Sequence, residues 1–308
     1  MRWILCGKND AAVACLEHLV ARGDRVLCVC VRGDDGVDRW QRSLGGAAQR
    51  YDVSTLLPGR INEPAPIAEL AAFRADALLS VQYDQILRAP LFDRIGCPCL
   101  NLHFALLPRH RGVAPISWAV FEGDREAGVT LHHMVVDIDA GDIVARKAVP
   151  IGPEATARDV YDAVSEACVT LFRETCPFPE SLLSRRLAQD PEQASYHKNG
   201  DFDFAQRRVD WARPADELQR WLRAMIFPPM QHPEIGHRDR NWEVTSVGGI
   251  LGPPSPFAPG TVLETGQDGV EVACAGGTLR IAGLVDPARP SASGQDLFEE
   301  IAVGDRLA

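Results

Sequence analysis

The sequence predicts an α/β protein in which a mainly parallel sheet is followed by a small C-terminal β-barrel. In the first half, apolar runs of strand length alternate with amphipathic helical stretches, which is the pattern of βαβ units. In the last third, short apolar runs are separated by Gly, Pro and Asp turns, which is typical of a compact β domain. With 308 residues, the chain is long enough for two domains. We expect a catalytic domain at 1–189, a linker at 190–205 and a β domain at 206–308.

The elements of the first domain follow from hydrophobic periodicity. The helix expected at 156–174 is the clearest, because Val160, Val164, Cys168 and Leu171 form an apolar stripe along it. The predicted strands are 2–6, 26–31, 75–81, 97–102, 129–137 and 143–151. The other predicted helices run from the turn at Gly7 to about Gly23, around 38–50, and at 67–73 and 114–121.

The second domain begins with a short amphipathic helix, predicted at 214–225 with Leu218, Trp221, Leu222 and Met225 inward. The polar stretch 190–203 has no clear period and is expected to be the linker before it. Strands are predicted at 242–247, 260–263, 270–274 and 278–284, and the stretches 267–269 and 275–277 match hairpin turns.

Composition and charge argue against several classes of function. The net charge is −10 and the pI is about 5.3, so the chain as a whole does not favour binding to nucleic acid. The apolar run at 1–6 stops at Gly7, far short of a signal peptide or a membrane span, so no membrane role is expected. The nine cysteines are scattered, and the closest pairs lack the Cys-x-x-Cys spacing of zinc sites. We therefore expect a cytoplasmic protein without a metal site.

The candidate catalytic residues lie between positions 101 and 139. Asn101 and His103 are two residues apart on a predicted strand, so their side chains share one face. An amide can donate to a developing oxyanion, and an imidazole can move a proton near neutral pH. Asp139 would complete the set as the carboxylate that orients or charges the histidine. On spacing alone, a purely structural role at a strand end is an equally good interpretation.

The wider pattern is more specific. Starting at Asn101 the chain reads Asn-x-His-x-x-Leu-Leu-Pro-x-x-Arg-Gly, followed by Gly128-Val-Thr130 and Asp139-Ala-Gly141. This pattern resembles the folate-dependent formyltransferase family, which includes glycinamide ribonucleotide, methionyl-tRNA and amino-sugar N-formyltransferases. The match looks closest to the formyltransferase domain that acts on UDP-4-amino-4-deoxy-arabinose, and it is strong over about 1–190 and weak in the tail.

The resemblance implies a Rossmann-like catalytic domain, an OB-like C-terminal domain and N10-formyltetrahydrofolate as formyl donor. It implies that Asn101, His103 and Asp139 are catalytic. Folate would be held, largely by backbone groups, by Gln85, Ile86, Leu87, Val135, Val136 and Asp137. The amine substrate would contact Lys8, Asn9, Arg111 and His132, with Lys8 and Asn9 at a helix start that can bind phosphate.

Two positions depart from the family pattern. Ala105 stands where the family usually has Ser, and Ala127 where it usually has Thr. Neither side chain carries the chemistry directly, so we expect a local adjustment and not a loss of activity. The resemblance also implies a cis peptide bond between Leu107 and Pro108.

The amine acceptor is open at this stage. A nucleotide-linked amino sugar is expected, with hydroxyornithine of siderophore synthesis and methionyl-tRNA as rivals. Residues 204–308 contain ten Arg, no Lys and fourteen acidic residues, a net charge of −4 that suits a tRNA backbone poorly. A non-catalytic folate-binding module would not need all three catalytic side chains, whereas a hydrolase that deformylates the donor would share them. A homo-oligomer also remains open.

Overall fold

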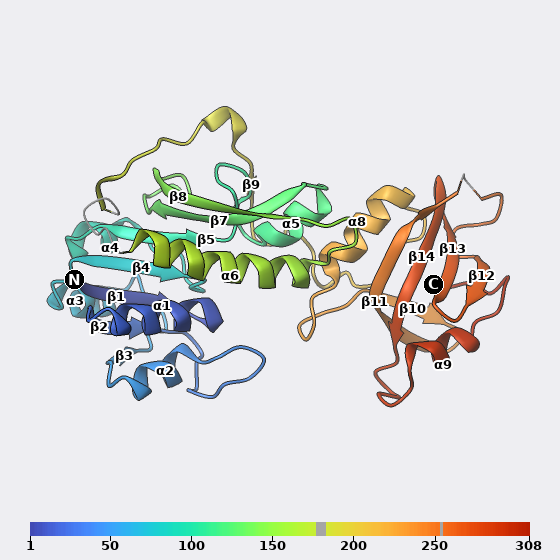
Figure 1. Ribbon diagram of the computed structural model, residues 1–308, viewed down its shortest axis with the longest axis horizontal. Helices are drawn as coiled ribbons and strands as arrows, with labels where there is room; N and C mark the ends of the chain where they lie inside the picture. The colour runs from blue at the N-terminus through green and yellow to red at the C-terminus, as the bar shows by residue number, and fades with distance from the viewer. Residues whose placement is uncertain (177–182, 253–254) are drawn as a thin grey trace. The chain divides into compact units, whose positions relative to one another are not determined.

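The computed structural model describes residues 1–176, 183–252 and 255–308 (Figure 1). The chain divides into two compact units, each built from several stretches of sequence. Unit 1 comprises 1–115, 127–149 and 162–198, and unit 2 comprises 116–126, 150–161 and 199–308. The expected bounds of 1–189 and 206–308 treat each domain as one continuous stretch, whereas residues 116–126 and 150–161 cluster with 199–308.

The central sheet has seven strands in the order β3-β2-β1-β4-β5-β7-β8. The strands from β3 to β5 are parallel, and β7 is antiparallel to β5, so the expected α/β class with a mainly parallel sheet is confirmed. Their bounds are β1 Arg2–Gly7, β2 Arg25–Cys30, β3 Thr55–Leu56, β4 Ala77–Val81, β5 Cys99–His103, β7 Glu126–His133 and β8 Ile143–Pro150.

Helices follow the strands along the chain. They are α1 Asn9–Ala21, α2 Leu44–Arg50, α3 Pro64–Ala72, α4 Ala89–Ile95, α5 Pro115–Phe121 and α6 Ala157–Thr175. The helix predicted around 38–50 begins only at Leu44, because the Ser43 hydroxyl accepts a hydrogen bond from the Gly46 N–H (2.8 Å) and caps the helix there. Helix α4 was not predicted.

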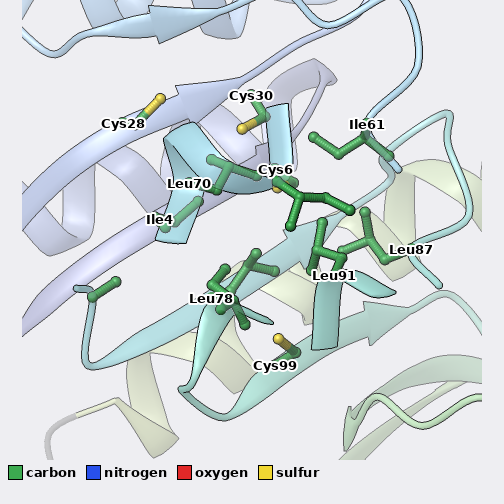
Figure 2. Packing of buried hydrophobic residues seen from close by; sticks show 13 residues of the cluster. Ile4, Cys6, Cys28, Cys30, Ile61, Leu70, Leu78, Leu87, Leu91 and Cys99 are labelled. Atoms are coloured by element: carbon green, nitrogen blue, oxygen red, sulfur yellow. The ribbon is translucent and has the colours of Figure 1, made fainter. Parts of the chain in front are cut away.

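The two faces of the sheet are covered separately. Along β1, Ile4 and Cys6 point into a core that includes Leu70 of α3 and Leu91 of α4 (Figure 2). Trp3 lies on the opposite face, where its ring meets Phe172 of α6 edge to face, with centroids 6.3 Å apart. This alternation is what a strand buried on both faces requires, and it explains why β1 reads as a continuous apolar run.

One predicted strand was too long. The strand expected at 129–137 ends at His133, where the His133 N–H donates to the carbonyl of Asp142 (2.9 Å). Residues 134–142 therefore form a loop and not a strand end. This correction matters for the site, because Val135, Val136, Asp137 and Asp139 all lie in that loop.

The expected small C-terminal β domain is confirmed in unit 2. It contains α8 Ala215–Met225, the antiparallel sheet β10-β11-β14-β13-β12 and α9 Gly294–Glu299. The strand bounds are β10 Glu234–His237, β11 Arg240–Leu251, β12 Val262–Gly266, β13 Gly269–Cys274 and β14 Gly277–Val285. The two predicted hairpin turns connect β12 to β13 and β13 to β14.

The last residues of the chain join the two edges of this sheet. Leu307 forms an antiparallel bridge with His237 of β10, and Arg306 forms one with Thr261, next to β12. The segment thus supplies partners to both edge strands, which would otherwise expose unpaired backbone groups. Within the described residues, no helix is long and apolar enough to cross a membrane.

Candidate active site

The candidate site lies where several strands of unit 1 end. The carboxyl ends of β1, β4 and β5 meet at one edge of the sheet, and the chain order reverses between β1 and β4. Ligands of open α/β sheets bind at such a reversal. Asn101 and His103 are on β5, paired with His132 and Thr130 of the antiparallel β7.

The structure brings four predicted residues together. Asp139 Oδ2 is 3.6 Å from His103 Nδ1, and its Oδ1 is 3.5 Å from both His132 Nε2 and Asn101 Nδ2. The Asn101 amide is also 3.2 Å from His132 Nε2. The two imidazole rings meet edge to face, with centroids 6.3 Å apart. Two side chains of β5 and one of β7 therefore surround the carboxylate of Asp139, which lies in the 134–142 loop.

Asp139 is held in place as an anion. Its backbone has a positive φ of 54°, which is sparsely populated for a residue other than Gly, and the Gly112 N–H donates to Oδ2 (2.8 Å). Burial by itself would raise the pKa of Asp139, but His103, His132 and the Gly112 N–H stabilise the charged form. Together they hold the pKa of this carboxyl well below its usual value.

The backbone partners of both imidazoles define which ring nitrogens face the carboxylate. His103 Nε2 donates to the His110 carbonyl (2.8 Å), so its Nδ1 is the nitrogen directed at Asp139. His132 Nδ1 donates to the His133 carbonyl (2.9 Å), so its Nε2 is the nitrogen that faces both the Asn101 amide and Asp139 Oδ1. His132 therefore directly neighbours two of the three candidate catalytic residues.

Thr130 holds the loop that follows β5. Its hydroxyl donates to the Ala105 carbonyl (2.6 Å) and accepts from the Leu107 N–H (3.1 Å). The Leu107–Pro108 peptide bond is cis, as the resemblance implied. Since residue 105 enters this arrangement through its backbone carbonyl, an alanine there preserves the same hydrogen bond.

The segment after α6 supplies residues that the sequence did not reveal. Gln189 donates through Nε2 to the carbonyls of Asp139 (2.8 Å) and Gly141 (2.7 Å), and its Oε1 accepts from Arg111. β6 Arg111–Gly112 pairs in parallel with β9 Tyr196–His197, inside the stretch expected to be a linker. A polar stretch without periodicity gives no sign of such contacts, so only the three-dimensional structure shows them.

Three of the six residues expected to hold folate line two cavities. A cavity of about 290 Å³ is lined by Ile86, Val136 and Ile138 together with Arg88, Ala89 and Pro90. Val135 lines a second cavity of about 400 Å³ together with Met134 and His133. The side chains of Ile86 and Val136 are 50% and 69% exposed, which leaves apolar surface available to a flat ligand.

The other three expected folate residues present less to a ligand. The Gln85 side chain is engaged internally, since its Oε1 accepts from the Ile61 N–H (2.8 Å) and its Nε2 donates to the Pro58 carbonyl (3.0 Å). Leu87 is buried in the core shown in Figure 2. Asp137 is exposed, and its carbonyl accepts from the Ala140 N–H (3.2 Å). Of these three residues, Asp137 alone is exposed.

Lys8 and Asn9 lie at the end of β1 and the start of α1, and both contact the loop after β4. Lys8 forms an ion pair with Asp84, and the Asn9 amide donates to Gln82 Oε1 (3.1 Å). Asn9 and Gln82 both have positive φ values, 66° and 54°. Both residues therefore lie where the strand order reverses between β1 and β4, and the charge of Lys8 is already paired there with Asp84.

Comparison with solved structures places the fold among sugar N-formyltransferases. WlaRD, a sugar 3N-formyl transferase, was solved in the presence of dTDP and 5-N-formyl-THF; it superposes with a TM-score of 0.71, 21% identity and coverage of 92% of this chain and 97% of that one. The Helicobacter canadensis N-formyltransferase, in complex with folinic acid and dTDP-3-aminofucose, gives the same TM-score and identity, with coverages of 91% and 98%. At this identity the likeness concerns the fold.

Comparison of sequences shows the family as well as the fold. Residues 17–175 match the formyl transferase family model, and 203–301 match that of the formyl transferase C-terminal domain. The methionyl-tRNA formyltransferase of Geobacillus thermodenitrificans is 31% identical, covering 99% of this chain and 95% of that protein. The one from Pseudomonas syringae pv. tomato is 32% identical, covering 100% and 98%. The chain therefore belongs to the formyl transferase family, and it is a folate-dependent formyltransferase.

Proposed function

We propose that this protein transfers the formyl group of N10-formyltetrahydrofolate to a primary amine of a nucleotide-linked amino sugar. The observation that carries the chemistry is the convergence of Asn101, His103 and Asp139, with the carboxylate held ionised in a largely buried position. Formylation of UDP-4-amino-4-deoxy-arabinose, the reaction of the enzyme that the sequence was expected to resemble most, is one case of this proposal.

The reaction forms a bond between the amine nitrogen and the formyl carbon and breaks the bond from that carbon to N10. Negative charge develops on the formyl oxygen, the amine loses a proton, and N10 leaves with one. The Asn101 amide is placed to donate to that oxygen. His103 can donate to it only through Nδ1, the nitrogen that faces Asp139, because its Nε2 donates to the His110 carbonyl. A donor of this kind typically lowers the barrier by about 2.7–4 kcal/mol.

In this mechanism, Asp139 stabilises the positive charge that forms during the reaction. Because its pKa is held low, the carboxylate stays ionised through the neutral range but is a weak base on its own. It stabilises the cationic amine that exists once the new bond has formed, or a proton on His103 Nδ1, 3.6 Å away. The proton of the amine is then passed on, directly or through water, toward the departing nitrogen.

The structure offers a fitting place for the donor. The cavity between residues 86–90 and the 134–142 loop has apolar walls, formed by Ile86, Val136 and Ile138, that suit a flat heteroaromatic ring. Backbone N–H and C=O groups of the 134–142 loop would form hydrogen bonds with the polar edge of the ring. When bound, the donor supplies the activated formyl group, and the protein supplies position and charge.

This donor site predicts a pattern of hydrogen exchange. A non-transferable formyl-folate analogue is expected to slow exchange of the amides at 85–87 and 135–139 while leaving strand β13 unchanged. The reason is that folate is held mainly through backbone groups of these two stretches. Exchange measured by mass spectrometry checks this, and protection confined to other segments would place the donor elsewhere.

Two features support an amino-sugar acceptor. The net charge of −4 over residues 204–308 does not favour a tRNA backbone, and the similar solved enzymes act on sugars, one of them in complex with dTDP-3-aminofucose. Methionyl-tRNA is the second candidate, because the curated relatives described above carry that name at 31–32% identity over nearly the whole chain. Hydroxyornithine remains a further rival within the same chemistry.

Lys8→Ala is expected to raise the KM of the sugar acceptor about 3–10-fold and to leave folate binding unchanged, because it removes a ground-state contact to phosphate. Asp84→Asn is the matched variant: it frees Lys8 from its ion pair and is expected to lower the same KM. Steady-state kinetics measure both. If neither variant changes the KM, this turn is not part of the acceptor site.

The acceptor class is tested by incubating the protein with N10-formyltetrahydrofolate and a panel of amines, followed by mass spectrometry. The panel contains dTDP- and UDP-linked amino sugars, hydroxyornithine and methionyl-tRNA. We expect a gain of one formyl group on a nucleotide-linked sugar. Preferential formylation of methionyl-tRNA would reject the sugar assignment and leave the formyl transfer chemistry intact.

A further inference from the structure

The segment 185–197, which follows α6, contacts several parts of the candidate site within unit 1. At its start, the Arg185 carbonyl accepts from His133 Nε2 (3.2 Å), and Leu187 forms a two-hydrogen-bond bridge with Ile143 at the start of β8. At its end, the Ser195 hydroxyl accepts from the His110 N–H (2.8 Å), and His197 Nε2 lies 3.1 Å from His110 Nδ1. His110 in turn provides the carbonyl that orients His103.

Gln189 is the central contact of this segment, and it reaches two functional groups at once. Its Nε2 donates to the carbonyls of Asp139 and Gly141, at 2.8 and 2.7 Å. Its Oε1 accepts from Nη2 and Nε of Arg111, at 2.8 and 3.1 Å. Resting on the function proposed above, we propose that Gln189 is a positioning residue for formyl transfer, which fixes the backbone that carries Asp139 and aims Arg111 beside it.

The Asp139 backbone needs such an anchor. Asp139 has a positive φ, and its loop is packed so closely that a Cβ on Gly141 would lie 1.9 Å from the His133 carbonyl oxygen. The two amide hydrogens of Gln189 bind carbonyls on both sides of Ala140 and so hold this turn in one conformation. A displacement of about 1 Å at a catalytic group can reduce the rate about a hundredfold.

Among side chains of this length, only an amide can both donate to the two carbonyls and accept from Arg111. A glutamate would face the two carbonyls with acceptors only, whereas Gln189 donates to them and accepts from Arg111. In addition, no carboxylate among the described residues lies within ion-pairing distance of Arg111. Gln189 therefore orients the guanidinium without neutralising it, and the charge remains available to an anionic acceptor such as a nucleotide diphosphate.

The test is a double-mutant cycle measured with the best amino-sugar acceptor of the panel. Gln189→Ala and Gln189→Met are expected to lower kcat about 10–100-fold, and the isosteric Gln189→Glu is expected not to restore it. In an Asp139→Asn background, Gln189→Ala should lower kcat by less than about a further threefold, because the carboxylate that Gln189 positions is already missing. Gln193→Ala, an exposed glutamine of the same segment, is the control and should leave kcat unchanged.

Three results would overturn the inference. An equal loss from Gln189→Ala in both backgrounds would mean that the residue only supports folding, as would thermal melting that shows all three Gln189 variants unfolded. A kcat within about threefold of wild type in Gln189→Ala would remove any role in positioning. Absence of formyl transfer by the wild-type protein would instead reject the proposed function, so the two failures are distinguishable.

Discussion

Asp139→Asn is expected to lower kcat for formyl transfer at least about a hundredfold. The asparagine keeps the shape of the side chain and can still accept from the Gly112 N–H, but it removes the negative charge that faces His103 and His132. The developing positive charge on the attacking amine then loses its counter-charge in a largely buried site, where such an interaction is strong. Steady-state rates with N10-formyltetrahydrofolate and an amine acceptor measure the effect.

Asp142→Asn is the matched control, because this aspartate lies in the same loop but is 42% exposed and directed at Arg186. Its kcat should stay within about threefold of wild type. Folding of both variants is checked by thermal melting. A folded Asp139→Asn protein with near-normal turnover would remove the carboxylate from the mechanism.

His103→Ala is expected to have an effect of the same size, a loss of at least about a hundredfold in kcat. It removes the imidazole whose Nδ1 faces Asp139 Oδ2 and is placed to donate from that nitrogen to the formyl oxygen. The KM for the donor should change little, because the proposed donor site lies at the loops around 86 and 136. His18→Gln on α1, distant in sequence and packed against Phe172, serves as the control. Full activity of a folded His103→Ala protein would contradict the assigned role.

The fold was predictable where local pattern dominates. Strands β1, β4 and β5 are largely buried and read as mainly apolar runs, and α6 carries a regular stripe, so all of them were located to within a few residues. The end of β7 was misplaced because alternation continues through Met134 and Val136 after the strand has ended. What ends β7 is the hydrogen bond from His133 to Asp142, a contact that no local pattern encodes.

The site was predictable only in part, for the same reason. Asn101 and His103 share a strand face, so their proximity follows from the period of two, and the motif supplied Asp139. The contacts of Gly112 and Gln189 join segments that lie 27 and 50 residues apart from Asp139 in sequence, whereas His110 lies seven residues after His103. Two of them act through backbone groups, and a backbone N–H or carbonyl has no signature in the sequence.

The most direct test of the central claim follows the formyl carbon itself. Wild-type protein is incubated with N10-formyltetrahydrofolate labelled with ¹³C in the formyl group and with the preferred nucleotide-linked amino sugar, and the products are identified by NMR. We expect the label to appear as a formamide on the sugar amine, with one tetrahydrofolate released per formamide, and this product to be nearly absent with Asp139→Asn. Label recovered only as formate would contradict the account and identify a hydrolase.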